Sequence, residues 1–483
     1  MTTQTSLLTA ALFLLTFFSA NAQARVNIVN TGLSLSYDFE DRQYEEVNTD
    51  RGLNDTLNSR NDEEYQSIAI TPRIRLISTG IKDRFEVRAS PSLKYDLIDS
   101  ETNWDNNLFL AAERSMNKNW RLIGSNSLLR TDYYESSTNS DFETTQDFET
   151  TQDSSPELSA DLGRTRYWRN ALNLTSEHLY GQQSLIDFGF NYIILRNDES
   201  ETRSYDDYDR YIGSITNQHR FNQNWKTVTA LSIVRGEFED TGAIALLTEE
   251  ESLSDDVMEY RLGLTGENNY SRQTTLSLSY DYIGTRYDED LQVDGDIHQA
   301  QLRWNHNYSR QTTITLGAGP SYEKSEEQDA NTGANGIAKI NYQGQRGSMS
   351  LGLEKRYDVD NFSGTNKKGF VDLWETRLLA DYQILASLAI DGQIRYTYED
   401  RNNRPVLLDD SLSTTDSNNL TLDEYHIDTI VTGMGLHYDF WKNYTASIAY
   451  TFTTQDSDIL GDDYDDHRVL LSLSWQQDVF RWK

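Results

Sequence analysis

Residues 84–97 read Arg-Phe-Glu-Val-Arg-Ala-Ser-Pro-Ser-Leu-Lys-Tyr-Asp-Leu, and this stretch decides the fold. Its odd-numbered positions carry mainly apolar side chains, and its even-numbered positions carry charged or polar ones. Because successive side chains of a β-strand point to opposite faces, the alternation predicts a strand with one apolar and one polar face.

The same alternation recurs along most of the chain. The segments around residues 186–194, 276–282, 388–398 and 444–452 place Ile, Leu, Phe, Tyr or Ala at almost every second position. Each segment is about 9–12 residues long, which is the length that a tilted strand needs to cross the hydrocarbon layer of a bilayer. The pattern begins near residues 32–40 and ends at 469–475.

The connections between these segments alternate between two classes. One class is short and lies at 78–82, 117–119, 181–183, 222–224, 271–273, 309–311, 344–347 and 441–443. The other class is long and acidic. Residues 44–65, 131–162, 197–209 and 456–466 together carry 28 acidic and three basic residues, a charge of −25 out of −34 for the whole chain. Long loops at one end and short turns at the other are typical of an outer-membrane barrel.

The predicted fold class is therefore all-β, with a single antiparallel transmembrane up-and-down β-barrel over residues 23–483. About 20 strands are expected, and 18 are the alternative because the pattern is faint at 104–113 and 338–342. The last strand either ends at Trp475 or continues through Trp482. Pro72, Pro91 and Pro320 lie inside expected strands, and we expect β-bulges there because proline cannot donate a ladder hydrogen bond. A soluble β-sandwich would also alternate, but its connections would be of similar length at both ends.

The first 22 residues are expected to be a signal peptide. Residues 7–18 form an apolar segment of 12 residues that is followed by Ala20-Asn21-Ala22. A short apolar core before Ala-x-Ala is the secretory pattern, although residues 1–6 contain no Lys or Arg. The expected location is the cell outer membrane of a Gram-negative bacterium, with outer-membrane lipid and lipopolysaccharide as partners.

The composition excludes several functional classes. The chain of 483 residues has 77 Asp and Glu against 43 Lys and Arg, so a nucleic-acid partner is not expected. It contains no Cys, which removes disulfides and thiolate metal sites. None of its seven His residues has a spacing that defines a nucleophile pair, so we expect no enzyme activity and no cofactor.

The polar parity of the strands predicts the residues that line the pore. If apolar side chains face lipid, the opposite parity sends many arginines inward, several of them with an acid two residues away. The predicted lining residues are Arg73, Arg75, Arg84, Arg88, Arg169, Arg261, Arg303, Arg356, Arg377, Arg395, Glu86, Glu259 and Glu375, and Glu354 is expected to accompany Arg356. They have two interpretations: a cationic wall that holds carboxylate or phosphate groups, or ion pairs that only fill the interior.

The size of the barrel and the acidic loops leave further alternatives open. Side chains cannot fill a barrel of about 20 strands, so the lumen is a water channel or is plugged, and residues 131–162 are long enough to fold in as a plug. The run Asp462-Asp463-Tyr464-Asp465-Asp466 could collect divalent cations, but it matches no calcium loop, and a solvated acidic surface is the preferred interpretation.

The chain resembles the porin-2-like family of outer-membrane β-barrels. The resemblance is carried by turns such as Asn222-Gln-Asn-Trp225, which echoes Asn117-Lys-Asn-Trp120, and by segments such as Asn170-Ala-Leu-Asn-Leu-Thr175. This family includes barrels associated with exopolysaccharide loci and PEP-CTERM/exosortase systems in proteobacteria. The resemblance implies an outer-membrane pore and carries no catalytic residues.

The expected function is a porin-like channel for passive passage of small solutes or for export of an exopolysaccharide, for which an acidic polymer would suit the inward arginines. The alternative is a surface-binding barrel with acidic loops and a closed lumen. The sequence predicts neither the solute nor the oligomeric state.

Overall fold

The computed structural model describes residues 25–44, 62–132, 158, 163–198, 205–239, 256–288, 293–325, 330–364, 368–401, 425–458 and 462–482. The expected signal peptide and large parts of the acidic loops lie outside these residues. In the described part, no helix is long and apolar enough to cross a membrane.

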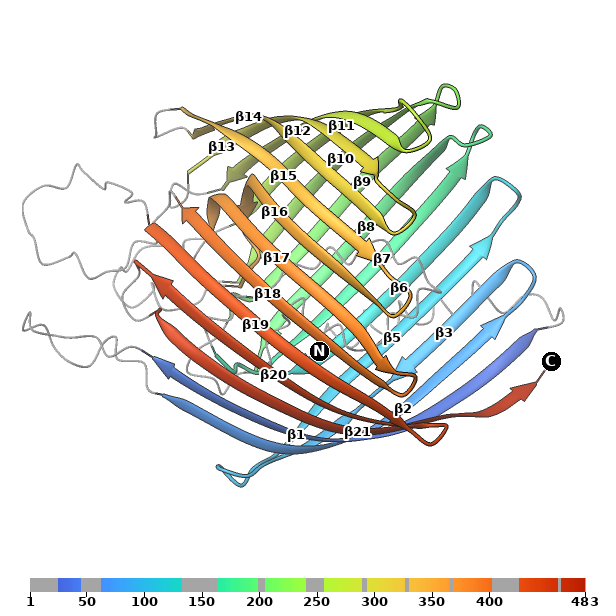
Figure 1. The fold of residues 1–483 in the computed structure, drawn as a ribbon, viewed down its shortest axis with the longest axis vertical. Helices are drawn as coiled ribbons and strands as arrows, with labels where there is room; N and C mark the ends of the chain where they lie inside the picture. The colour runs from blue at the N-terminus through green and yellow to red at the C-terminus, as the bar shows by residue number, and fades with distance from the viewer. Residues whose placement is uncertain are drawn as a thin grey trace, which may run out of the picture.

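The described residues form one antiparallel sheet that closes on itself because β1 pairs with β21 (Figure 1). The strands are β1 (Val26–Tyr44), β2 (Glu63–Thr79), β3 (Asp83–Ala89), β4 (Ser92–Asp96), β5 (Thr102–Ser115), β6 (Trp120–Thr131), β7 (Tyr167–Leu179), β8 (Leu185–Asn197), β9 (Tyr208–Arg220), β10 (Trp225–Phe238), β11 (Val257–Asn269), β12 (Thr274–Tyr287), β13 (Gly295–Asn307), β14 (Thr312–Ser325), β15 (Asn331–Gln343), β16 (Gly347–Asp360), β17 (Gly369–Leu385), β18 (Leu388–Arg401), β19 (Tyr425–Phe440), β20 (Tyr444–Ser457) and β21 (Tyr464–Trp482).

Twenty strand positions surround the barrel, because β3 and β4 are two parts of one strand between β2 and β5. The predicted closed antiparallel barrel of about 20 strands is confirmed, and both faint segments are strands, β5 and β15. The last strand continues to Trp482, which pairs with Asn27 of β1. One end of the barrel, here called the short-turn end, has nine connections of two to five residues; the other, the long-loop end, has connections of five to 35 residues.

The prediction of bulges at the three prolines is wrong. Ala89 pairs with Ile74 and Leu93 with Ile70, so four residues separate the pairs on both strands, and the register is unchanged across Pro91. The ladder is interrupted there, and Pro72 of β2 lies opposite the gap. Proline removes a donor, but the sheet tolerates the loss by opening the ladder locally instead of inserting a residue.

The ladder between β13 and β14 also opens without a register shift, beside Pro320. Asn335 of β15 donates through Nδ2 to the free carbonyl oxygens of Ala300 and Pro320, at 3.1 Å each. A Cβ atom on Gly319 would overlap the carbonyl oxygen of Ala300. Glycine is therefore required where β14 approaches β13 at this interruption.

The parity rule holds over most of the barrel. Phe188, Leu278 and Ile394 belong to the predicted outward set, and they are 42%, 61% and 47% exposed. Monomeric soluble proteins rarely expose so much contiguous apolar surface, and the wall of a membrane barrel must. The polar side chains of the opposite parity therefore point to the inside.

One part of the wall departs from this rule at the long-loop end of β16 and β17. Tyr357, Val359 and Phe370 have the outward parity, yet they are 4%, 8% and 2% exposed. They pack against Ile283 of β12 and Ile297 of β13, two side chains of the inward parity. The end of the β16–β17 hairpin therefore lies inside the sheet formed by β12 and β13.

The pairing of the strands shows how this arrangement arises. β15 pairs with β16 only from Gln343 and Ser348 to Gly336 and Lys355, so the long-loop end of β16 leaves its neighbour. Its backbone is then satisfied by a side chain of β13. Gln299 donates through Nε2 to the carbonyl oxygen of Tyr357 at 2.7 Å and accepts the Tyr357 amide at 3.2 Å.

Candidate functional site

The inner wall carries the predicted lining residues, and they fall into separate groups. Those on β2 and β3 form the first group, which is centred on Glu86. The carboxylate of Glu86 accepts from Arg75 at 2.8 Å, from Arg84 at 3.3 Å and from Arg88. Glu86 is fully buried, whereas the three arginine side chains are 20–33% exposed. Three guanidinium groups therefore surround one carboxylate, and Arg73 lies on the same face of β2.

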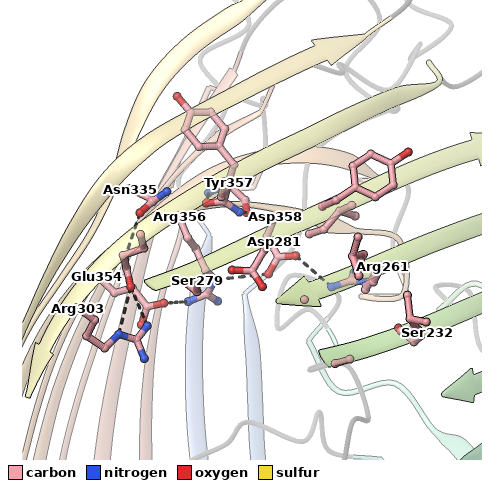
Figure 2. Close-up of a pocket in the computed structure, with 18 of the residues that line it drawn as sticks. Ser232, Arg261, Ser279, Asp281, Arg303, Asn335, Glu354, Arg356, Tyr357 and Asp358 are labelled. Carbon is pink, nitrogen blue, oxygen red and sulfur yellow. Dashed lines mark hydrogen bonds and ion pairs between the residues drawn. The ribbon is translucent and has the colours of Figure 1, made fainter. Parts of the chain in front are cut away.

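The second group lines a cavity of about 470 Å³ between the wall strands β9–β13 and the displaced end of β16. Figure 2 shows Arg303 and Glu354 at one end of the cavity and Arg261 and Ser232 at the other. Arg261 pairs with Glu259 at 3.0 Å and reaches Asp358 of β16 at 3.6 Å. Arg356 pairs with Glu354 at 3.2 Å. The cavity wall therefore presents groups of both charge signs.

Two predicted arginines lack a carboxylate partner within ion-pair distance among the described residues. Arg303 donates to the side-chain oxygen of Gln301 at 2.8 Å and faces the cavity. Arg377 of β17 lies two residues from Glu375, but the expected ion pair between them is not formed in the described structure. Because no carboxylate of the described residues lies within ion-pair distance of them, these two arginines are the most suitable to interact with an anion.

Other predicted lining residues are covered. Arg169 of β7, Glu86 and Glu259 are 6%, 0% and 1% exposed, so they cannot offer a free surface to a solute. Arg395 of β18 lies on the inner face and pairs in register with Arg377. Glu86, Glu259 and Glu354 each form an ion pair with an arginine two residues away.

A third group holds residues 163–166, which precede β7, against β1 and β2. Arg164 Nη2 lies 2.9 Å from Asp38 and 2.6 Å from Glu40, both on β1. The Arg164 guanidinium also lies over the Tyr65 ring of β2, 3.6 Å from its centroid. The members of this inner ionic cluster are Asp38, Glu40, Tyr65, Lys94, Asp132, Arg164 and Arg468.

Neighbouring opposite charges keep Asp132 and Arg164 ionised in the connection between β6 and β7. Burial would raise the pKa of Asp132, but Lys94 at 2.6 Å and Arg164 outweigh burial and hold the pKa well below its usual range. Burial would lower the pKa of Arg164, but Glu40, Asp38 and Asp132 raise it above its ordinary value. Buried charges are tolerated when each is paired and hydrogen-bonded, as they are here.

A fourth group holds residues 361–364, which follow β16, against the opposite wall. Phe362 stacks on Phe238 of β10 with ring centroids 5.7 Å apart and meets Tyr208 of β9 edge-on at 5.4 Å. The inner aromatic cluster comprises Leu158, Tyr167, Ala171, Ile193, Leu195, Tyr205, Tyr208, Val234, Val257 and Phe362, with Ile212, Phe238 and Tyr287 packed against it. Asn361 next to Phe362 donates to Glu259 of β11 at 2.8 Å.

The sequence interpretation missed both in-folded contacts. Only Leu158 of the predicted plug 131–162 lies in the aromatic cluster, whereas Asp132 closes the ionic one; most of that segment lies outside the described residues. The preferred interpretation of residues 462–466 as a solvated acidic surface is wrong for Asp462, Tyr464 and Asp466, which are 5%, 3% and 3% exposed. Asp466 accepts a hydrogen bond from Arg42 at 3.2 Å. Among the described residues, no cluster of His, Asp and Glu could hold a metal ion.

Comparison with known proteins gives a likeness of architecture alone. No protein-family model and no curated protein matches the chain. Among solved structures, the chain is similar to Pseudomonas aeruginosa OpdQ, with 12% identity over 94% of this chain and 98% of that one and a TM-score of 0.43. It is also similar to Acinetobacter baumannii OccAB4 (13% identity, 95% and 100% coverage, TM-score 0.42) and to a BenF-like porin from Pseudomonas fluorescens Pf-5 (10% identity, 93% and 99% coverage, TM-score 0.43).

Proposed function

We propose that the chain is a porin-like channel of the outer membrane that lets small anionic solutes pass by diffusion. The proposal rests on the difference in polarity between the outer and inner faces of the barrel wall. Large apolar side chains are exposed on the outside, and arginines that include Arg88 and Arg303 line the inside. A wall of this kind suits a polar path through an apolar layer.

Small solutes are favoured over a polymer by the interior. Residues 163–166 and 361–364 both cross to another part of the inner wall, and the cavity beside β16 has a volume of about 470 Å³. Those contacts narrow the space that an exopolysaccharide would need. Export of an exopolysaccharide, which the family resemblance implies and for which the inward arginines would suit an acidic polymer, is therefore the second outcome to test rather than the proposal.

The arginines give the proposed channel its preference for anions. A guanidinium keeps its charge at any physiological pH and binds carboxylate or phosphate with two parallel hydrogen bonds. Arg303 faces the cavity and has no carboxylate within ion-pair distance among the described residues, and the Arg88 side chain is 33% exposed. Anions would accumulate beside these two guanidinium groups.

The test is the conductance of the purified full chain in planar bilayers. Stepwise conductance with a reversal potential that favours anions is expected, and Arg88→Gln combined with Arg303→Gln should shift that potential toward cations. Arg130→Gln is the matched control, because Arg130 of β6 has the outward parity and its loss should leave the reversal potential unchanged.

Two results would contradict the proposal. Negligible conductance in a correctly folded barrel would favour the surface-binding alternative with a closed lumen. Conductance blocked by acidic oligosaccharides but insensitive to small anions would favour polymer export.

A further inference from the structure

The short-turn end of the barrel combines exposed bases with exposed apolar side chains. Its nine turns contain no Asp or Glu, and six of them carry one base each: Lys82, Lys118, Arg272, Arg310, Arg346 and Lys442. The charge of these turns is therefore opposite in sign to that of the four long connections, which carry −25.

Large apolar side chains stand next to these bases. Ile81 precedes Lys82 and is 78% exposed, and Trp441 precedes Lys442 and is 82% exposed. Tyr270 and Tyr308 lie two residues before Arg272 and Arg310 and are 76% and 73% exposed. Such exposure of aromatic rings is costly in water, so these rings require another environment.

The turns are constructed to hold this arrangement. In the repeated sequence Tyr-Ser-Arg-Gln-Thr-Thr, the hydroxyl of Ser271 accepts the amides of Gln273 at 3.2 Å and Thr274 at 3.0 Å. The second copy repeats the contacts, with Ser309 accepting from Gln311 and Thr312 at 3.1 and 3.0 Å. Because the backbone and the serine satisfy each other, the tyrosine and arginine side chains remain available outside the turn.

A second turn type uses asparagine in the same way. Asn117 Oδ1 accepts the amides of Asn119 at 2.8 Å and Trp120 at 3.0 Å, and Asn222 makes the equivalent bonds to Asn224 and Trp225 at the same distances. The tryptophans are 36% and 52% exposed and start the next strands. Interfacial aromatic residues thus recur around the short-turn end.

The six bases have no ion-pair partner in the part of the chain that the structure describes, and all six are exposed. An isolated base at the surface of a soluble protein would be unremarkable, since water solvates it. Here each base except Arg346 lies within two residues of a large apolar side chain that is about half exposed or more. That surface continues directly into the apolar outer wall of the strands.

From these observations we infer that the short-turn end binds the headgroups of anionic glycerophospholipids in the leaflet that it contacts. The aromatic and aliphatic side chains enter the boundary of the hydrocarbon layer, and the adjacent Lys and Arg side chains reach the phosphates. A soluble acidic partner fits less well, because it would contact the bases and leave the ring of lipid-level aromatic side chains unexplained. This inference rests on the proposed membrane location and is independent of conduction.

Tryptophan fluorescence of the reconstituted full chain tests the inference, since Trp120, Trp225 and Trp441 lie at the turns. Bilayers of phosphatidylcholine receive equal fractions of either brominated phosphatidylglycerol or brominated phosphatidylcholine as the quencher. We expect quenching to report a preference of about fivefold for the anionic lipid at low salt. The preference should fall in 1 M NaCl, because exposed charges are then screened within about 3 Å.

Two six-fold variants supply the comparison. Lys82→Gln, Lys118→Gln, Arg272→Gln, Arg310→Gln, Arg346→Gln and Lys442→Gln together should abolish the preference while brominated phosphatidylcholine still quenches. Exchange of Lys for Arg and of Arg for Lys at the same six positions keeps the charge, so this variant should retain the preference for the anionic lipid.

Each other outcome has a definite meaning. Equal quenching by both lipids in the unchanged chain would overturn the inference and favour a soluble acidic partner. A preference for the anionic lipid that survives in the glutamine variant would also overturn it. Absence of quenching by any brominated lipid would instead overturn the membrane location on which the proposed function depends.

Discussion

The segment beside Arg164 is held to the inner wall by charges, whereas the segment beside Phe362 is held by aromatic rings. Arg164 is bound by Asp38 and Glu40 of β1 across an interval of several strands. Phe362 instead packs against the rings of Phe238 and Tyr208 on β10 and β9. Both contacts attach a connection to the inner wall of a wide barrel. The strength of the first should depend on pH, and the strength of the second on side-chain shape.

The difference arises because the inward side chains differ between the two parts of the wall. The inward positions of β1, β4 and β21 carry ionisable side chains, so a connection can lie there only if it completes their pairing. The inward positions of β8–β11 carry Ile193, Leu195, Val234 and Val257, and a connection that covers them removes apolar surface from water. A single-cysteine probe can compare the two, because the chain contains no Cys.

Arg164→Gln should have the largest effect. It leaves Asp38, Glu40 and Asp132 buried without one of their bases, and breaking a buried ion pair costs about 3–5 kcal/mol. Thr165, which is 2% exposed, changed to Cys is the probe. Labelling of that thiol should accelerate by about a hundredfold or more. An unchanged labelling rate would mean that the ionic cluster does not hold the segment.

Phe362→Ala should have the next largest effect. It should weaken the contact of residues 361–364 with the wall by about 3 kcal/mol, because it removes a ring that packs against Phe238 and Tyr208. Arg210 also lies over this ring, 4.2 Å from its centroid. Ser363, 7% exposed, changed to Cys reports the release. The Thr165→Cys probe should not respond in the same variant, since the two clusters share no side chain. A response of both probes would show that the in-folded segments move as one unit.

Acidification should separate the two contacts. The pKa of Asp132 is depressed in the folded protein by Lys94 and Arg164, although burial opposes them. Its contribution to stability is therefore complete above the unfolded pKa of about 4 and is lost as the pH falls through the lower folded value. Labelling of Thr165→Cys by a pyridyl disulfide should rise below about pH 4 relative to labelling of Ser363→Cys. Equal pH profiles for the two probes would remove the electrostatic explanation.

Phe362→Leu should have the smallest effect. Leucine keeps most of the apolar volume but loses the stack on Phe238, which is worth about 1 kcal/mol. Labelling of Ser363→Cys should rise only about fivefold. A rise as large as that of Phe362→Ala would show that ring geometry, and not apolar volume, holds residues 361–364.

The sequence predicts the wall of the barrel better than its interior. Alternation is a local property, so Phe188 and Ile394 could be assigned to the outside without any knowledge of their neighbours. The same reasoning placed Arg75, Arg88 and Arg303 on the inside. It could not indicate that Glu86 would contact three arginines, because Arg75 of β2 reaches Glu86 of β3 only through the register of these two strands.

The exceptions to the parity rule also arise from contacts between strands that no local pattern indicates. Tyr357, Val359 and Phe370 carry an ordinary outward pattern, and nothing in their spacing marks the departure of β16 from β15. The displaced end of β16 is held by Gln299 of β13, whose side chain bonds to the Tyr357 backbone, a contact that exists only in the folded barrel.

The amino-acid sequence by itself determined the antiparallel barrel wall and the asymmetry of its two ends, because period-2 alternation and turn length act between near neighbours in the chain. The choice of 20 strands over 18 came from the strand pairing. Tertiary structure alone decided which connections contact the inner wall and which arginines lie beside a carboxylate. Those outcomes depend on contacts such as Arg164 with Glu40 and Asn361 with Glu259, which join residues more than a hundred positions apart. No local pattern encodes such a pairing, since its energy exists only after the barrel has closed.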